Sequence, residues 1–351
     1  MVEDPSPDLN RRIQIDRRST LSARSNVMES HPQNSAASPP GVSVIIPAYN
    51  YAHYLPSAIN SVLRQDYPVI EIIVVDDGSK DNCAEVVARY RDRVRYIHQE
   101  NTGLSAARNT GIHVATHPFI AFLDADDIWR PGMLTRIIET FLRLPGEFAV
   151  VACPYILTDT VGIPLQDKRL DSKFFGEITM RDIVLKNRFY PSATVVRKSV
   201  FDECGFFDTT LRSSEDRDMW IRVAARHRVY LIKEPMALIR KHGTNMSRNA
   251  DRMKQNMAKV IAKVRQSGVV SQGNSLFWRR VNSIYYYQTA WMYHDEGRPV
   301  AALRDLLVSL FSWPFWWSPN RLNENFLFRL RSGFTFLMAG VRNWLKSSMA
   351  M

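Results

Sequence analysis

Between residues 42 and 124 the chain alternates runs rich in Val and Ile with segments of helical spacing. Two of the runs, VSVIIP from residue 42 and IEIIVVDD from residue 70, are typical of strands buried on both faces. The same pattern predicts further strands at 94–99 and 119–124, and helices at 53–65, 82–92 and 103–115. Strands that alternate with helices form a mainly parallel, Rossmann-like sheet with right-handed crossovers and flanking helices, so we expect an α/β protein.

In sheets of this kind, ligands bind beyond the carboxyl ends of the strands. Four segments fall at such ends in the predicted sheet: 47–50, 76–79, 101–103 and 124–127. Two of them are acidic, and a third acidic cluster lies further along the chain at 213–218. The three acidic clusters are therefore the candidates for a binding site.

The first cluster, DDGSKD at 76–81, places Asp76 and Asp77 at the tip of a strand. Carboxylates there can accept hydrogen bonds from a nucleobase N–H or from ribose hydroxyls. Asp and Ser before a helix also serve as helix caps, and the cluster alone leaves both roles open.

The second cluster, LDADD at 123–127, places Asp124 and Asp126 two residues apart directly after a strand. If the chain stays extended, both side chains project to the same side, where their charges repel unless a cation or a proton compensates. A divalent ion shared between Asp126 and a nucleoside diphosphate would remove the repulsion, and Mg²⁺ and Mn²⁺ both accept such oxygen ligands. The alternative is a capping role, with Asp127 opening a helix that starts near Pro131.

The third cluster contains Glu215 and Asp216, which precede an amphipathic helix that carries Trp220. A carboxylate held at a helix start and facing a crevice can act as a general base. The alternative is a capping box whose first-turn acids favour the helix dipole.

The composition is that of an ordinary globular protein, with 45% apolar and 23% charged residues. Residues 1–40 have no apolar period and are rich in Ser, Pro, Asn and Arg, so we expect them to be disordered. Three widely spaced cysteines without a CxxC predict no disulfide framework and a reducing compartment. The first residues lack the apolar run of a secretory signal.

The excess of positive charge lies at the C-terminal end. Residues 248–351 carry 15 Arg and Lys against 5 Asp and Glu, and six of the eight Trp. The pattern there predicts helices, two of them joined at Gly297 and Arg298 with Pro299 in the first turn of the second. Basic and aromatic residues suit an anionic membrane surface, and equally a helical region that packs its aromatic residues against the main domain. No nucleic-acid-binding motif accompanies the charge, so nucleic acid is not an expected partner.

Six motifs follow one another along the chain: VSVIIPAYN (42–50), VVDDGSKD (74–81), ENTGLSAARNTGI (100–112), FLDADD (122–127), SSEDRDMWIR (213–222) and RKHGTNMS (240–247). In this order and spacing they resemble the family 2 glycosyltransferases, which use nucleotide-sugar donors and have the GT-A fold. The resemblance implies a GT-A domain over 41–247, between a disordered segment, 1–40, and a basic, aromatic-rich helical C-terminal region, 248–351.

For the nucleotide, the resemblance implies that Pro47, Ala48 and Tyr49 line the nucleobase pocket and that Asp77, together with Asp76, binds the base or the ribose. It also places Gly103, Arg108 and Asp124 near the nucleotide. Arg108 has the alternative role of tying its helix to the rest of the domain.

For the reaction, the resemblance implies that Asp124 and Asp126 are the family's DxD pair, with Asp126 as the direct ligand of Mn²⁺ or Mg²⁺. His242 matches a histidine that approaches the diphosphate or the metal, although a surface histidine is a nearly equal interpretation. Asp216 matches the catalytic base, and Glu215 beside it would orient the acceptor or the loop.

The implied activity is the transfer of a sugar from a nucleoside-diphosphate donor, usually a uridine diphosphate sugar, to a hydroxyl of a glycan or lipid-linked saccharide. One displacement, with Asp216 as base, would invert the anomeric configuration. The cysteine usage and the basic C-terminal region predict a cytoplasmic protein, peripheral at the inner face of the cytoplasmic membrane. The alternatives are a nucleotidyltransferase, although the first strand ends in PAYN and not in a Gly-rich phosphate loop, and a non-catalytic membrane-surface protein.

Overall fold

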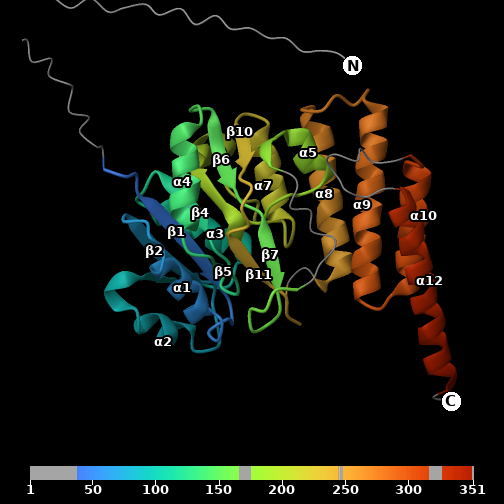
Figure 1. The fold of residues 1–351 in the computed structure, drawn as a ribbon, viewed down its shortest axis with the longest axis horizontal. Helices are drawn as coiled ribbons and strands as arrows, with labels where there is room; N and C mark the ends of the chain where they lie inside the picture. The colour runs from blue at the N-terminus through green and yellow to red at the C-terminus, as the bar shows by residue number, and fades with distance from the viewer. Residues whose placement is uncertain (1–37, 166–174, 244, 246–247, 316–325, 350–351) are drawn as a thin grey trace, which may run out of the picture. The chain divides into compact units, whose positions relative to one another are not determined.

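A computed structural model of the chain describes residues 38–165, 175–243, 245, 248–315 and 326–349. The expected disorder of residues 1–40 lies outside this part of the chain, apart from residues 38–40. The central sheet has eight strands in the order β3-β2-β1-β4-β9-β6-β10-β8. Figure 1 labels β2, β1, β4, β6 and β10 among them. Their bounds are β1 Val42–Ala48, β2 Ile70–Asp76, β3 Arg95–His98, β4 Phe119–Phe122, β6 Phe148–Ala152, β8 Gly176–Ile178, β9 Thr194–Arg197 and β10 Arg228–Leu231.

The first four strands in this order are all parallel, with Val42 of β1 opposite Ile70 of β2 and Phe119 of β4. This confirms the strands predicted between residues 42 and 124. β9 then runs antiparallel between β4 and β6, which makes the sheet mixed beyond β4. A smaller sheet has the order β5-β11-β7. Its strands are β5 Ile128–Trp129, β11 Ala237–Arg240 and β7 Tyr155–Thr158.

Helices cover both faces of the central sheet, which is why the central strands β4 and β6 are apolar and buried at every position. In β1, Val44 and Ile46 pack on one face while Ile45 packs on the other. The first face carries α1 Leu55–Leu63, α2 Cys83–Ala88 and α4 Met133–Arg143. The second carries α3 Leu104–Val114, α6 Val200–Cys204 and α7 Glu215–Ala224.

Two local expectations were wrong. The helix predicted at 82–92 ends at Ala88 and is followed by a 3₁₀ turn, Arg91–Arg93. Asp127 does not open a helix, because β5 follows it and α4 begins only after Gly132, whose φ is 80°. The carboxylate of Asp127 is buried instead, where it accepts hydrogen bonds from the Ser192 hydroxyl and from the backbone N–H of Arg240.

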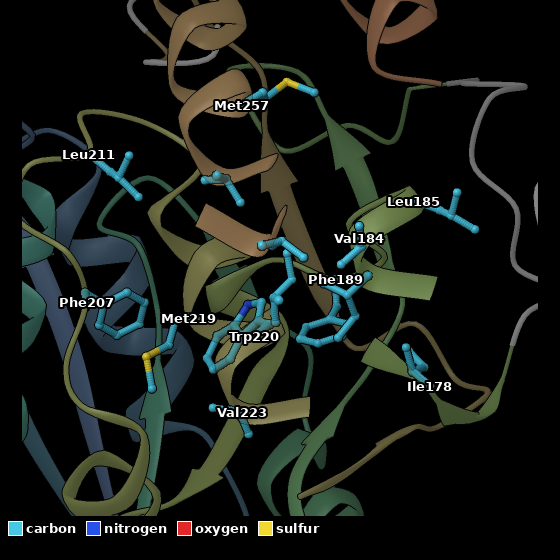
Figure 2. Packing of buried hydrophobic residues seen from close by; sticks show 14 of the residues in the cluster. Ile178, Val184, Leu185, Phe189, Phe207, Leu211, Met219, Trp220, Val223 and Met257 are labelled. Carbon is cyan, nitrogen blue, oxygen red and sulfur yellow. The ribbon is translucent and has the colours of Figure 1, made fainter. Parts of the chain in front are cut away.

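The C-terminal residues form helices, as predicted. They are α8 Ala250–Ser267, α9 Ser275–Asp295, α10 Pro299–Ser312 and α12 Phe326–Met349. Arg298 precedes α10 and Pro299 is its first residue, which confirms the predicted junction. Met257 of α8 and Trp220 of α7 belong to one apolar cluster, which also contains α5 Met180–Leu185 (Figure 2). Within the described residues, none of the helices has the length and apolar character that crossing a membrane requires.

Candidate active site

The tips of β1 and β2 carry the residues predicted to hold the nucleobase. Pro47 and Ala48 are buried at the end of β1, and the Ala48 carbonyl accepts a hydrogen bond of 2.9 Å from the N–H of Asp77. Tyr49 follows with 44% of its surface exposed. This ring is the accessible group of the three.

The carboxylates of Asp76 and Asp77 are bound to the protein itself. Asp76 accepts hydrogen bonds from the N–H of Ser79 at 2.8 Å and from the hydroxyl of Tyr96 at 2.5 Å. Burial opposes its ionisation, but these donors prevail and lower the pKa of Asp76. Asp77 accepts from the N–H groups of Thr102 and Gly103, at 2.9 and 2.8 Å. Both acids therefore stabilise the turns at the strand tips.

Gly103 begins α3 with a φ of 101°, which favours glycine. A Cβ built at this position would lie 2.5 Å from a guanidinium nitrogen of Arg212. The flexible Arg212 side chain could move away, so the positive φ is the feature that favours glycine where the N–H of residue 103 donates to Asp77.

Arg108 of α3 connects the two acidic clusters that follow. Its guanidinium lies 2.7 Å from Oδ1 of Asp124 and 2.6 Å from Oε1 of Glu215, and the side chain is 1% exposed. Asp124 comes directly after β4, whereas Glu215 is the first residue of α7. One buried cation therefore holds the end of β4 and the start of α7 together, which agrees with the tethering role expected as one alternative.

Asp126 lies among side chains from the segment after β11. The Nε2 atom of His242 is 2.8 Å from Oδ2 of Asp126, and Nδ2 of Asn245 donates to the same oxygen at 3.2 Å. The rings of Tyr51 and Tyr54 lie 5.5 and 5.1 Å from the imidazole centroid, so His242 packs between aromatic side chains. His242 is thus part of the site and not an isolated surface residue.

The aspartates after β4 repel one another. Burial and the charge of Asp126 raise the pKa of Asp124 above its ordinary value, although Arg108 opposes the shift. Burial and the charges of Asp126 and Asp124 raise the pKa of Asp127 well above its ordinary value. The geometry gives this end of the sheet an excess of negative charge that a cation would relieve.

Asp216 is the second residue of α7. Burial, followed by the charge of Glu215, raises the pKa of Asp216 to about 7, and Arg108 opposes the shift. Its Oδ2 atom accepts a hydrogen bond of 2.8 Å from Nδ2 of Asn187. A carboxyl group with this pKa exchanges a proton near neutral pH, as a general base must.

The fit of a divalent ion rests on the donor set around Asp126. A carboxylate, an imidazole and an amide converge there, and Asp124 follows the same strand. Mg²⁺ is usually held by one or two carboxylates together with substrate phosphates, and Mn²⁺ also prefers oxygen ligands, so the carboxylates of Asp126 and Asp124 fit either ion. Within the described part of the chain, no group of three or more His, Cys, Asp or Glu side chains is placed to hold a metal ion without further ligands.

The structure brings together Arg108, Asp124, Asp126, Glu215, Asp216 and His242, and leaves Asp76 and Asp77 at the neighbouring strand tips. Sequence reasoning missed Asn187, Ser192, Asn245, Tyr51 and Tyr54. Asn245 and Tyr51 lie in or beside quoted motifs. Asn187 and Ser192 had no local signal, because their partners are 29 and 65 residues away.

Solved glycosyltransferase structures have a similar mixed α/β fold. S. aureus TarS 1–349 in complex with UDP has a TM-score of 0.51 and 17% identity, covering 79% of this chain and 93% of that chain. The mannosyltransferase PcManGT from Pyrobaculum calidifontis in complex with GDP-Man and Mn²⁺ has a TM-score of 0.55 and 18% identity, covering 87% of both chains. These likenesses show that the fold is the GT-A fold of glycosyltransferases.

The sequence profile of glycosyl transferase family 2 matches residues 43–205. An uncharacterized glycosyltransferase of Rickettsia prowazekii (strain Madrid E) is 30% identical over 213 residues, which is 60% of this chain and 67% of that relative. The chain belongs to glycosyl transferase family 2, and it is an enzyme of the transferase class.

Proposed function

We propose that the chain is an inverting glycosyltransferase that moves a sugar from a nucleoside-diphosphate donor, with a uridine diphosphate sugar as the first candidate, to a hydroxyl of a glycan or lipid-linked saccharide. The observation that carries the proposal is the contact of Arg108 with both Asp124 and Glu215. Through it, the acids proposed to face the diphosphate and the acid proposed as base belong to one connected site.

Asp216 is the proposed base. Its pKa of about 7 leaves it substantially deprotonated at neutral pH, and Asn187 fixes one of its oxygens. In the proposed step the acceptor hydroxyl gives its proton to Asp216, and the hydroxyl oxygen forms a bond to the anomeric carbon. The bond from that carbon to the nucleoside diphosphate breaks on the opposite face, so the configuration inverts. A single carboxylate suffices, in contrast to the two that retaining hydrolases use.

Asp126, His242 and Asn245 are proposed to hold a divalent ion, with Asp124 beside them. When bound, Mn²⁺ or Mg²⁺ would neutralise charge on the departing diphosphate. Asp126 and His242 would orient the phosphates, while the ion pair with Arg108 holds the Asp124 side chain in position. Tyr49, the exposed group at the tip of β1, is proposed to stack on the nucleobase, with Asp76 and Asp77 shaping the turns around it.

The proposed donor class is supported by the ligands in the two structural neighbours, UDP in one and GDP-Man with Mn²⁺ in the other. The relatives and structural neighbours named above are glycosyltransferases and not nucleotidyltransferases. The direct experiment is a panel of nucleotide sugars incubated with the protein and Mn²⁺ or Mg²⁺. Release of a nucleoside diphosphate supports the proposal, whereas release of pyrophosphate supports the alternative.

A second proposal concerns location: a cytoplasmic protein attached peripherally to an anionic membrane through residues 248–351. Large apolar side chains are exposed on α10, on the residue Phe315 after it and on α12: Val300, Leu307, Phe311, Phe315, Leu330, Phe334, Leu337, Met338 and Val341. Those of α12 lie at relative positions i, i+4, i+7, i+8 and i+11, so they share one face of the helix. An apolar groove of about 290 Å³ lies between the two helices. We call these nine side chains the exposed apolar face.

The charge of the same region supports this proposal. Residues 248–351 carry a net charge of +10, and Arg331 is exposed on α12 beside the exposed apolar face. Apolar rings that enter a bilayer surface and cations that meet anionic headgroups reinforce one another. The free cysteines Cys83, Cys153 and Cys204 support a reducing compartment.

A further inference from the structure

The segment 187–192 connects the two chemical parts of the site. At its start, Nδ2 of Asn187 donates to Oδ2 of Asp216 at 2.8 Å. At its end, the Ser192 hydroxyl donates to Oδ2 of Asp127 at 2.5 Å and accepts from the N–H of Asp124 at 3.0 Å. Six residues, Asn187 to Ser192, therefore connect the proposed base with the acids after β4.

Phe189 and Tyr190 lie between these contacts, and the first is buried whereas the second is exposed. Phe189 is 1% exposed, and its ring lies 5.8 Å from that of Trp220 in the core (Figure 2). Tyr190, the next residue, has extended backbone and is 42% exposed. The 3₁₀ turn Pro191–Ala193 follows directly, and the Tyr190 carbonyl accepts a hydrogen bond of 2.7 Å from the Thr194 hydroxyl. The anchors on either side hold the backbone of Tyr190 between the base and the acids after β4, with its side chain exposed.

A second ring restricts the first. Tyr155, at the start of β7, meets Tyr190 edge to face, with ring centroids 4.7 Å apart and an interplanar angle of 70°. An edge contact of this kind orients a ring, and the Tyr190 side chain stays partly exposed. An exposed aromatic side chain that is oriented by its neighbours presents an apolar surface in a fixed direction, which suits a ligand with an apolar face.

We infer that Tyr190, oriented by Tyr155, is a binding platform for a pyranose ring of the substrate. The inference rests on the proposed function, because it takes the sugar to lie between the base and the acids after β4. The electron-rich face of an aromatic ring attracts the weakly positive C–H groups that a pyranose presents on one face. A nucleobase is not the expected occupant, because the proposed nucleobase site lies at the tips of β1 and β2.

The pyranose can belong to the donor or to the acceptor, and the experiment has an arm for each. Saturation-transfer NMR is recorded with Mn²⁺ replaced by diamagnetic Mg²⁺, first with UDP-glucose and UDP-N-acetylglucosamine. It is then recorded with UDP plus the methyl pyranosides of glucose, galactose, mannose and N-acetylglucosamine. Wild-type protein is expected to saturate the pyranose C–H protons in at least one arm, which identifies the source of the ring.

Three variants make the result specific. Tyr190→Ala is expected to weaken the apparent pyranose affinity about two- to tenfold, the usual contribution of one aromatic contact, without reducing saturation of the uracil protons. Tyr190→Phe keeps the ring and should match wild type. Phe175→Ala is the control, because Phe175 is an aromatic residue with 54% exposure next to the edge strand β8.

The inference is overturned if no pyranose is saturated in either arm, or if Tyr190→Ala and Phe175→Ala behave alike. A parallel assay of nucleoside-diphosphate release keeps the two proposals apart. If the wild type releases nucleoside diphosphate but Tyr190→Ala does not change pyranose binding, the inference about Tyr190 is wrong and the proposed function stands. If pyranose binding depends on Tyr190 but no donor releases nucleoside diphosphate, the inference about Tyr190 stands and the proposed function is wrong.

Discussion

Asn187 donates a hydrogen bond of 2.8 Å from Nδ2 to Oδ2 of Asp216, across 29 residues of sequence. The bond links Asn187, two residues after the end of α5, to Asp216, the second residue of α7. A donor aimed at a carboxylate favours its charged form, whereas burial and the neighbouring Glu215 disfavour it. The hydrogen bond from Asn187 therefore affects both the position of the proposed base and its proton affinity.

The first prediction concerns pH. Since Asp216 must be deprotonated to accept a proton and its pKa is about 7, the turnover rate should rise as the pH increases through about 7. Asn187→Ala removes a donor to the charged form, so the pKa of Asp216 should rise and the acid limb of the profile should move to higher pH. Nucleoside-diphosphate release measured from pH 5 to 9 gives both profiles. Asn274→Ala, which alters the cap of α9, is the control, and an unmoved limb in Asn187→Ala would contradict the assignment.

The second prediction concerns Arg108. Arg108→Met leaves the carboxylates of Asp124 and Glu215 without their shared cation, and breaking a buried ion pair on one side typically costs about 3–5 kcal/mol of folding free energy. Urea unfolding of wild type and variant measures the loss. Arg143→Met breaks an exposed pair with Glu139 and should cost at most about 1 kcal/mol. If the two variants lose equal stability, Arg108 does not hold the site together.

The third prediction concerns the metal. Asp126→Ala removes the carboxylate that His242 and Asn245 contact, so the Mn²⁺-dependent part of UDP binding should disappear. Calorimetric titration of UDP, with Mn²⁺ and with EDTA, measures that part directly. The exposed Asp92 gives the matched variant Asp92→Ala, for which no change is expected. Metal-dependent binding that survives in Asp126→Ala would place the ion elsewhere.

The fourth prediction concerns the exposed apolar face. Phe311 and Phe334 are 80% and 66% exposed, and transfer of a Phe side chain out of water is worth about 1.5–3 kcal/mol. Phe311→Ser and Phe334→Ser should each reduce binding to vesicles of phosphatidylcholine and phosphatidylglycerol by about tenfold, as followed by flotation. Leu142→Ser, at a residue of α4 that is 67% exposed, should have no effect. Equal binding to vesicles of pure phosphatidylcholine would contradict the electrostatic part of the membrane proposal. If the protein binds neither kind of vesicle, the membrane proposal is wrong.

The strands and helices between residues 42 and 124 could be predicted because each has a local sequence pattern, either a run of Val and Ile or apolar residues at helical spacing. It did not predict that β9 enters antiparallel between β4 and β6, or that β5, β11 and β7 form a second sheet. These strands have two to four residues each, so their pairing depends on contacts between distant parts of the chain.

The same distinction applies to the site. Motifs beside predicted strand ends and a helix start pointed to Asp124, Asp126 and Asp216, since polar residues at such places are visible in the sequence. Asn187 and Ser192 lie in a segment with no motif and become part of the site only through the fold. The capping role weighed for Asp127 was wrong because its carboxylate accepts hydrogen bonds from side-chain and backbone groups that no neighbouring residue provides.

The proposed base is tested most directly by Asp216→Asn, which keeps the shape of the side chain and removes its ability to accept the proton. With a donor that wild type cleaves, the account predicts a fall of roughly 10²- to 10⁴-fold in sugar transfer, measured as nucleoside-diphosphate release, with the affinity for UDP and Mn²⁺ unchanged. Turnover of Asp216→Asn at the wild-type rate would contradict it.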